Sequence, residues 1–168
     1  MHIVLVEPEI PQNTGNVART CAAIGANLHL VHPLGFSVDE RALRRAGLDY
    51  WHLVEVYEHA SLASFLDSLA PDNQVVLYTS RSSLAYTDVA YDPDAYLVFG
   101  RETTGLPDRL VDRHRGPIVR IPMVTDARCL NLSNAVAVGA YEAARQNGFA
   151  GLAVSRATGS RTATSQDG

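Results

Sequence analysis

Residues 129–148 read CLNLSNAVAVGAYEAARQNG, an almost wholly apolar segment that opens with three polar side chains. The segment predicts a buried helix that closes the domain. One N-cap needs a single side chain such as Asn or Ser, yet Asn131, Ser133 and Asn134 all crowd the entry. We expect one of them to be the cap and the other two to contact a substrate or a neighbouring segment.

Upstream of this helix, apolar runs alternate with helical patterns along the whole chain. Strands separated by helices need crossover connections, which predicts an α/β fold with a mostly parallel sheet and helices on both faces. Gly25 and Gly47 are expected to end helices, and Ser61 is expected to begin one. The predicted strands cover 3–8, 28–33, 53–58, 74–80, 95–100 and 117–123, and the earlier helices cover 13–25, 38–47, 61–70 and 106–114.

Length and composition indicate one soluble domain. The chain has 168 residues, 46% of them hydrophobic, and no apolar run approaches the roughly 18 residues that span a bilayer. We expect a single domain over residues 1–151 and a mobile tail over 152–168, which is rich in Ser, Thr, Ala and Gly. The start of the chain lacks signal-peptide features, and two isolated cysteines do not form a disulfide framework, so a cytoplasmic protein without a membrane partner is expected.

The net charge of −4 argues against a protein that coats nucleic acid without specificity. A negative net charge is nevertheless compatible with a local basic patch that faces one folded RNA. In open α/β sheets, ligands bind beyond the carboxyl ends of the strands. Here the segments at those ends, 8–19, 78–83, 99–107 and 121–134, carry amides, hydroxyls and a few arginines.

Several common catalytic motifs are absent from these segments. The sequence holds no GxxxxGK[ST], no GxGxxG after the first strand, no GxSxG and no HExxH, so neither a nucleotide triphosphatase nor a metal enzyme is expected. A site of backbone, amide and hydroxyl groups suits a bulky neutral or cationic cofactor better than a triphosphate.

Three motifs occur in order along the chain: NTGNVARTC, LVFGRETTGLP and IPMVTDARCLNLSNAVAVGAYEAARQ. Together they resemble the SPOUT superfamily of S-adenosylmethionine-dependent RNA methyltransferases, over roughly residues 1–150. The stretches EPEIPQNTGNVART and LRRAGLDYWHL further resemble its small single-domain members. Those enzymes methylate the ribose 2′-OH of the wobble nucleotide, cytidine or a modified uridine, in tRNA-Leu.

The resemblance implies a deep trefoil knot formed by the C-terminal segment, which general topology would not predict. It also implies a homodimer, S-adenosylmethionine as the only cofactor, no metal, and the anticodon stem-loop of a tRNA as the partner. Five positions match the cofactor contacts of the family: Tyr78, Gly100, Ile121, Cys129 and Leu130. Gly100 is alternatively a turn glycine and Ile121 a core residue, and Cys129 stands where relatives often have Ser, which favours a backbone contact.

Four positions match catalytic residues of the family, namely Arg19, Glu102, Ser133 and Asn134. A guanidinium stays protonated, so Arg19 is better suited to grip a phosphate and stabilise a developing alkoxide than to act as a base. A structural role for Arg19 is the alternative. Glu102 lies just before a predicted helix start, where a carboxylate also stabilises helix amides.

The remaining predicted contacts concern RNA. Arg41, Arg44 and Arg45 share one face of the predicted helix over 38–47, and Trp51 follows closely. Arginines grip phosphates and aromatic rings stack on unpaired bases, whereas the alternative is a solvated helix with Trp51 in a core or dimer contact. Asn13 and Asn16 are expected to fix the first motif against RNA, or to cap its helix.

Two other functions compete with wobble methylation. The first is methylation of ribosomal RNA or of another tRNA position by a SPOUT enzyme. The second is a catalytically silent protein that binds RNA or the cofactor on the same scaffold, against which the intact Arg19, Glu102 and Asn134 argue.

Overall fold

The computed structural model describes residues 1–36, 51–126 and 129–153. The predicted helix over 38–47, with Arg41, Arg44 and Arg45, lies outside the described residues.

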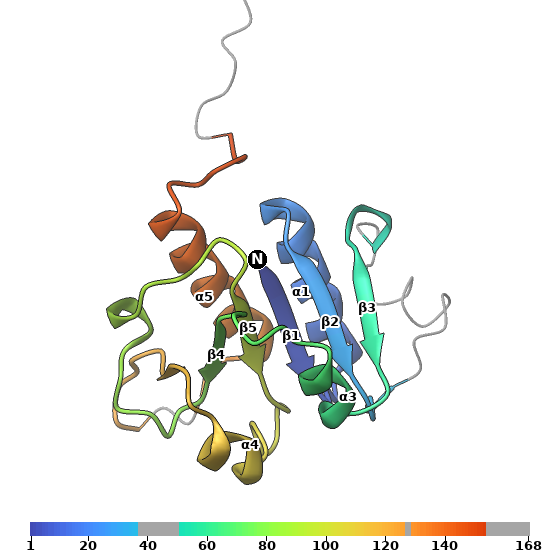
Figure 1. Cartoon of the computed structure of the whole chain (residues 1–168), viewed down its shortest axis with the longest axis vertical. Helices are drawn as coiled ribbons and strands as arrows, with labels where there is room; N and C mark the ends of the chain where they lie inside the picture. Colours follow the sequence, from blue (N-terminus) through green and yellow to red (C-terminus); the bar gives the residue numbers. More distant parts are fainter. Residues whose placement is uncertain (37–50, 127–128, 154–168) are drawn as a thin grey trace, which may run out of the picture.

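The described residues form a six-stranded sheet in which every paired strand runs parallel to its neighbour (Figure 1). The spatial order is β3-β2-β1-β5-β4-β6. In the centre, β1 pairs with β2 from His2 opposite Asn27 to Val6 opposite Val31. The strands are β1 (His2–Val6), β2 (Asn27–Val31), β3 (Val56–His59), β4 (Val75–Tyr78), β5 (Tyr96–Phe99) and β6 (Ile118–Val119).

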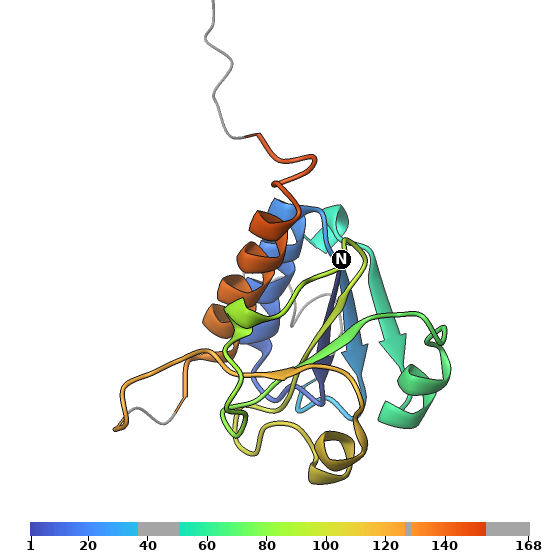
Figure 2. The same ribbon diagram turned by 60° about the vertical axis from the view of Figure 1, so that its left-hand side comes forward.

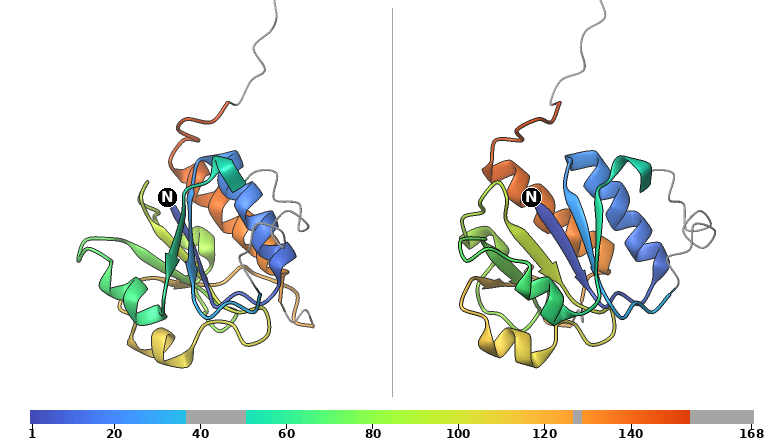
Figure 3. Two further views of the ribbon diagram at one scale, coloured as in Figure 1. Left: turned by 90° about the vertical axis from the view of Figure 1, so that its right-hand side faces the viewer. Right: turned by 45° about the vertical axis from the view of Figure 1, so that its right-hand side comes forward.

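Helices cover both faces of this sheet, as the alternating pattern predicts. The two long helices, α1 (Pro11–Ile24) and α5 (Leu132–Gln146), lie side by side on one face (Figure 2). The short helices α3 (Leu62–Asp67) and α4 (Asp108–Arg113) lie on the other side of the sheet, which Figure 3 shows from two further directions. The described residues also contain two single turns of 3-10 helix, η1 (Trp51–Leu53) and η2 (Tyr86–Asp88).

The central strands are apolar on both faces because both faces are covered. Along β1, Ile3 and Leu5 pack towards α1 and α5, whereas Val4 and Val6 pack towards α3 and α4. All four side chains are fully buried. This arrangement explains why the strands appear in the sequence as continuous apolar runs and not as alternating ones.

Local signals placed most boundaries correctly. Gly25 ends α1 in the left-handed conformation, with φ of 68°, and Ser61 caps α3 through a reciprocal hydrogen-bond pair with Ser64. The predicted strand over 117–123 is wrong in length, because only Ile118–Val119 pair with β4. Beyond them Arg120 makes a single bridge to Ala85, and Pro122 has no backbone N–H to continue a ladder.

Leu152, the first residue of the predicted mobile tail, packs its side chain against the core on the α1 and α5 face. Its backbone N–H donates to the carbonyl of Phe149. Residues 154–168 lie outside the described part of the chain. Within the described residues, no helix combines the length and apolar composition needed to cross a bilayer.

Candidate active site

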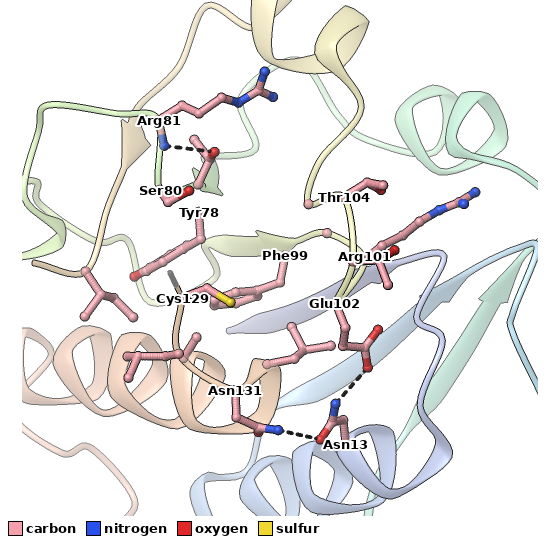
Figure 4. Close-up of a pocket in the computed structure, with 18 of the residues that line it drawn as sticks. Asn13, Tyr78, Ser80, Arg81, Phe99, Arg101, Glu102, Thr104, Cys129 and Asn131 are labelled. Carbon is pink, nitrogen blue, oxygen red and sulfur yellow. Dashed lines mark hydrogen bonds between the residues drawn. The ribbon is translucent and has the colours of Figure 1, made fainter. Parts of the chain in front are cut away.

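A hollow of about 640 Å³ opens at the carboxyl ends of the strands (Figure 4). It lies where the chain order of the strands reverses, between β1 and β5, which is the general position of ligand sites in such sheets. Its walls come from the segments that follow β1, β4, β5 and β6, and from the start of α5. The four loops predicted from the sequence therefore meet at one site.

Two stacked aromatic rings line the hollow. Tyr78 ends β4 and Phe99 ends β5, and their ring centroids are 4.5 Å apart with an angle of 23° between the ring planes. Both side chains are buried, so the adjacent parallel strands present a flat apolar surface at their ends. Such a surface can pack on a planar ligand group.

The Tyr78 ring is held from behind. Its hydroxyl lies 2.8 Å from the hydroxyl of Tyr91, which itself donates to the carbonyl of Tyr86 at 2.7 Å. Tyr78 is therefore the donor to Tyr91, and burial raises the pKa of both phenols, that of Tyr91 to about 12. A Cβ at Gly139 would lie 2.8 Å from the ring, so the ring fits only because α5 has no side chain there.

Gly100 follows Phe99 at a point where the β5–α4 loop folds back on itself. The backbone groups of Arg101 and Gly105 exchange two hydrogen bonds, and Gly105 has φ of 71°. A Cβ at Gly100 would lie 2.1 Å from the carbonyl carbon of Gly105. This close approach of backbone atoms within the loop is enough to require glycine at position 100, which is the turn-glycine alternative. Gly100 also lines the hollow.

The polar entry to the last helix forms a cap and a connection. The Oδ1 atom of Asn131, the N-cap of α5, accepts from the backbone N–H groups of Ser133 and Asn134 at 3.0 Å and 3.4 Å. The Ser133 hydroxyl donates to the same oxygen at 2.7 Å. The amide nitrogen of Asn131 is left to donate to Oδ1 of Asn13 at 2.9 Å.

Glu102 continues this connection into the first motif. Its carboxylate accepts from the backbone N–H groups of Glu9 and Ile10 at 2.8 Å and 3.2 Å, and from the side-chain amide of Asn13 at 2.9 Å. The expectation that Glu102 would stabilise the helix following it is wrong, because α4 begins only at Asp108. Glu102 instead supports the entry to α1, whose own N-cap residue Ile10 has no side-chain acceptor.

Further ion pairs and hydrogen bonds tie the same loops together. Arg101 forms an ion pair with Glu7, which has φ of 54° just after β1. Glu9 accepts from the backbone N–H and the hydroxyl of Thr103. The loops after β1 and β5 are therefore joined by three carboxylates, including Glu102.

All five predicted cofactor positions, Tyr78, Gly100, Ile121, Cys129 and Leu130, line the hollow. Cys129 and Leu130 are exposed there, and Tyr78 is buried. The structure brings together residues that are up to about fifty positions apart in the sequence. Their individual contacts with a cofactor remain predictions.

The predicted catalytic and RNA-binding residues are more dispersed. Asn13 is buried in the wall of the hollow, whereas Asn16 and Arg19 follow at three-residue steps along α1 and are exposed. Ser133 is buried and Asn134 is exposed on α5, and neither lines the hollow in a single chain. The Ser133 hydroxyl donates to Asn131 in the cap of α5, and its predicted catalytic role stays a prediction.

Three residues of the site were not singled out from the sequence. Phe99 resembles any core residue at a strand end, and Tyr91 lies in a segment with no motif. Arg81 lines the hollow and pairs with Asp108 at the start of α4. In the sequence, the only feature that pointed to Arg81 as a site residue was its position after the fourth predicted strand.

Comparison with known proteins agrees with this geometry. Residues 1–141 match the model of the SpoU rRNA Methylase family. The chain belongs to the SpoU methylase family. This membership confirms the resemblance inferred from the three motifs, and the six-stranded parallel sheet with helices on both faces is the fold in which they occur.

Relatives within the family match nearly the whole chain. A tRNA (cytidine(34)-2′-O)-methyltransferase of Yersinia pestis is 46% identical over 156 residues, which are 90% of this chain and 96% of that protein. The enzyme of the same name from Burkholderia pseudomallei is 49% identical over 152 residues, 89% of this chain and 97% of that protein.

Solved structures give the same result. A structure described as giving insights into the 2-OH methylation of C/U34 on tRNA has a TM-score of 0.83 and 46% identity, with 88% of this chain and 95% of that one covered. An rRNA methyltransferase of Sinorhizobium meliloti with bound AdoMet has a TM-score of 0.76 and 28% identity. It covers 86% of this chain and 55% of that one.

Proposed function

We propose that this protein transfers a methyl group from S-adenosylmethionine to the ribose 2′-OH of the wobble nucleotide of tRNA, in tRNA-Leu isoacceptors. The observation that carries the proposal is the convergence of the three family motifs on one hollow at the β1–β5 reversal. The relatives that match nine-tenths of this chain are named for methylation at cytidine 34 of tRNA.

The residues around the hollow fit the cofactor. The hollow has the volume in which proteins hold small organic molecules, with the apolar Tyr78–Phe99 surface on one wall and Ile121 beside it. When bound, S-adenosylmethionine would supply a methyl group on a positively charged sulfur, which leaves as a neutral thioether. The ribose oxygen would bond to the methyl carbon as the carbon–sulfur bond breaks, and the hydroxyl proton would pass to solvent water.

Arg19 and Glu102 have different tasks in this proposal. The Arg19 guanidinium holds an RNA phosphate and stabilises the oxygen as it loses its proton. Glu102 is a positioning residue, because its oxygens accept from Glu9, Ile10 and Asn13 and thereby fix the loop that leads into α1. Arg19 lies further along that helix.

Recognition of the anticodon stem-loop is assigned to the basic segment between β2 and β3 and to the exposed end of α1. Arg41, Arg44 and Arg45 would hold backbone phosphates, and Trp51 would stack on an unpaired base. Asn16, exposed one turn before Arg19, is placed to contact the same RNA.

The family assignment also supports two larger features. We propose that the C-terminal segment is threaded as a trefoil knot, with residues 121–126 and 129–135 passing beneath the loops after β1, β4 and β5. We further propose a homodimer in which Asn134, exposed on α5, contacts the substrate of the partner subunit. A bacterial tRNA enzyme of this type would act in the cytoplasm.

The proposal is tested by calorimetry with S-adenosylmethionine, followed by transfer of a labelled methyl group to bulk tRNA. We expect binding of one cofactor per subunit and 2′-O-methylation at position 34 of tRNA-Leu. Transfer to ribosomal RNA or to another tRNA position would favour another SPOUT activity. Cofactor binding without transfer to any RNA would indicate the silent scaffold protein.

Arg19→Ala tests the assigned chemistry. Turnover should fall by at least about 100-fold, the lower end for a positioned catalytic group, while folding and cofactor affinity stay nearly unchanged. Arg115→Ala is the matched control, because it removes an exposed arginine at the amino end of β6. Near-normal turnover of the Arg19 variant would remove this residue from the mechanism.

A further inference from the structure

A second hollow, of about 570 Å³, is formed in part by the segment 120–125 that leads out of β6. Ser83, Arg120 and Thr125 supply its polar wall, and four apolar residues supply the rest. Met123 lines both this hollow and the cofactor hollow, and Ile121, the neighbour of Arg120, lines only the latter. The two hollows therefore adjoin one another at the segment that leads out of β6. We call the second one the Arg120 hollow.

Arg120 carries an unbalanced charge in the part of the chain that the structure describes. Its Nε atom is buried and has no hydrogen-bond partner, and no carboxylate lines the hollow. No ion pair is formed by its guanidinium within the described residues. A buried donor and a partly buried charge that lack partners are unfavourable, so a ligand that accepts hydrogen bonds and carries negative charge would bind favourably here.

The backbone around this arginine is fixed. The N–H of Arg120 donates to the carbonyl of Leu84 at 2.8 Å, and its carbonyl accepts from the N–H of Tyr86 at 2.9 Å. The segment that carries Ser83 is thus held against the segment that carries Arg120. A site whose walls are held in this way loses little conformational freedom when a ligand binds.

We propose that the Arg120 hollow binds a backbone phosphate of the RNA substrate, next to the nucleotide that is methylated. The inference rests on the proposed function, because it takes RNA as the substrate. A guanidinium fork beside two hydroxyl donors, with no acidic group, is the donor set that suits a phosphodiester. The hollow adjoins the cofactor hollow through Met123, as a phosphate next to the reacting ribose requires.

The composition of the chain strengthens the assignment. All 14 basic residues are arginines and the sequence contains no lysine, while the net charge is −4. A protein with this charge depends on particular arginines, and not on its overall field, to hold a polyanion. An arginine that is fixed, partly buried and free of acidic partners is the type of residue needed.

The first test compares Arg120→Gln with wild type for binding of bulk tRNA at several salt concentrations. Loss of a charge-assisted phosphate contact should weaken binding by about 10-fold and reduce the salt slope by about 1. Arg120→Lys should restore the slope but only part of the affinity, because lysine lacks the fork. Arg115→Gln is the matched control, and cofactor affinity should stay within about twofold in all variants.

A second variant keeps the proposal testable even if the Arg120 variants fold poorly. Ser83 is exposed and its side chain makes no hydrogen bond within the described residues, so Ser83→Asp should fold normally. Its carboxylate would pair with Arg120 and repel a phosphate, so tRNA affinity should fall at least as much as in Arg120→Gln. Ser83→Asn, which adds similar volume and a neutral amide donor without charge, should weaken tRNA binding less than Ser83→Asp does.

A third measurement identifies the phosphate. Synthetic anticodon stem-loops, each with one neutral methylphosphonate next to the target nucleotide, are titrated against wild type and Arg120→Gln. One of these methylphosphonates should weaken RNA binding to wild type and have no further effect on binding to Arg120→Gln, because the RNA change and the protein change remove the same contact.

The outcomes separate the two proposals. A wild-type protein that binds tRNA, together with an Arg120→Gln variant of unchanged affinity and salt slope, would overturn the phosphate site and leave the proposed function standing. If Arg120→Gln keeps its tRNA binding but its sedimentation coefficient differs from that of wild type, the hollow contacts a second copy of the chain. This result would also overturn the phosphate site. A wild-type protein that ignores tRNA would remove both.

Discussion

The hydrogen-bonded side chains Glu102, Asn13 and Asn131 connect loops, whereas those of His2, His29 and His59 connect strands. The first set, which we call the site chain, joins segments that share no strand ladder with one another. It lies in the wall of the cofactor hollow, where Figure 4 shows its members pointing towards one another. Its hydrogen bonds are therefore a main constraint on how these three segments meet.

The second set, which we call the imidazole chain, crosses β1, β2 and β3 on the face that α3 covers. His2 and His29 are 2.9 Å apart between ring nitrogens, and so are His29 and His59. His29 is buried and lies edge-on to Phe65, with the ring centroids 6.1 Å apart. Neutral imidazole donates through one ring nitrogen and accepts through the other, which matches its two neighbours.

The difference shows what each type of connection contributes. The strands under the imidazole chain are already held by backbone pairing, so its rings add packing and a sensitivity to protons. The loops under the site chain have no such pairing, so its loss should disturb the geometry of the hollow. We expect changes in the site chain to appear mainly in turnover, and changes in the imidazole chain mainly in stability.

The largest effect is expected for Glu102→Ala. The variant removes the acceptor of two backbone N–H groups and of the Asn13 amide, so the loop before α1 should shift. A displacement of about 1 Å in a site can lower turnover by about 100-fold. Steady-state methyl transfer to bulk tRNA measures the loss, and Glu102→Gln, which keeps one oxygen acceptor, should be intermediate. Equal turnover of all three proteins would refute a positioning role.

A smaller effect, on stability, is expected when the imidazole chain is titrated. Burial, followed by the proximity of His2 and His59, lowers the pKa of His29 to about 3, against 6.5 for an exposed histidine. Between these values the unfolded chain binds a proton that the folded chain does not. The contribution of neutral His29 to the free energy of unfolding is therefore complete above pH 6.5 and decreases as the pH falls. At pH 5 the free energy of unfolding should be lower by about 2 kcal/mol.

Urea unfolding between pH 5 and pH 8 measures this dependence. His29→Gln is the matched variant, because its amide also offers both a donor and an acceptor but does not titrate in this range. We expect its free energy of unfolding to depend less steeply on pH than that of wild type. Identical slopes for the two proteins would mean that His29 is protonated alike in the folded and unfolded states.

The smallest effect is expected at Asn131, which belongs to both the cap of α5 and the site chain. Asn131→Ala should lose about 1 kcal/mol of stability, as is typical for an N-cap, and also turnover. Asn131→Asp keeps the cap acceptor but cannot donate to Asn13, so it should retain stability and lose turnover. Thermal unfolding and methyl transfer measured on the same preparations separate the two roles, and parallel losses in the Asp variant would contradict the separation.

Much of the fold could be predicted because its signals are local. The apolar runs gave all six strands, and Gly25 and Ser61 marked helix ends through their own backbone and hydroxyl groups. The length of β6 could not be predicted, because it depends on which residues of β4 are in position to form backbone hydrogen bonds with it. The alternative that Glu102 stabilises the helix following it fails for a related reason, since the N–H groups that donate to its carboxylate belong to a segment about 90 positions away.

By itself, the sequence determined that this chain alternates strands and helices, that polar segments follow the strands, and that its three motifs are those of a methyltransferase family. Each of these follows from residues close together in the chain. Only the tertiary structure decided that Asn13 lies between Glu102 and Asn131, that Tyr78 fits because Gly139 lacks a side chain, and that Arg120 faces a second hollow. Such contacts depend on strand order and on long-range packing, which place distant residues together at distances that no local pattern encodes.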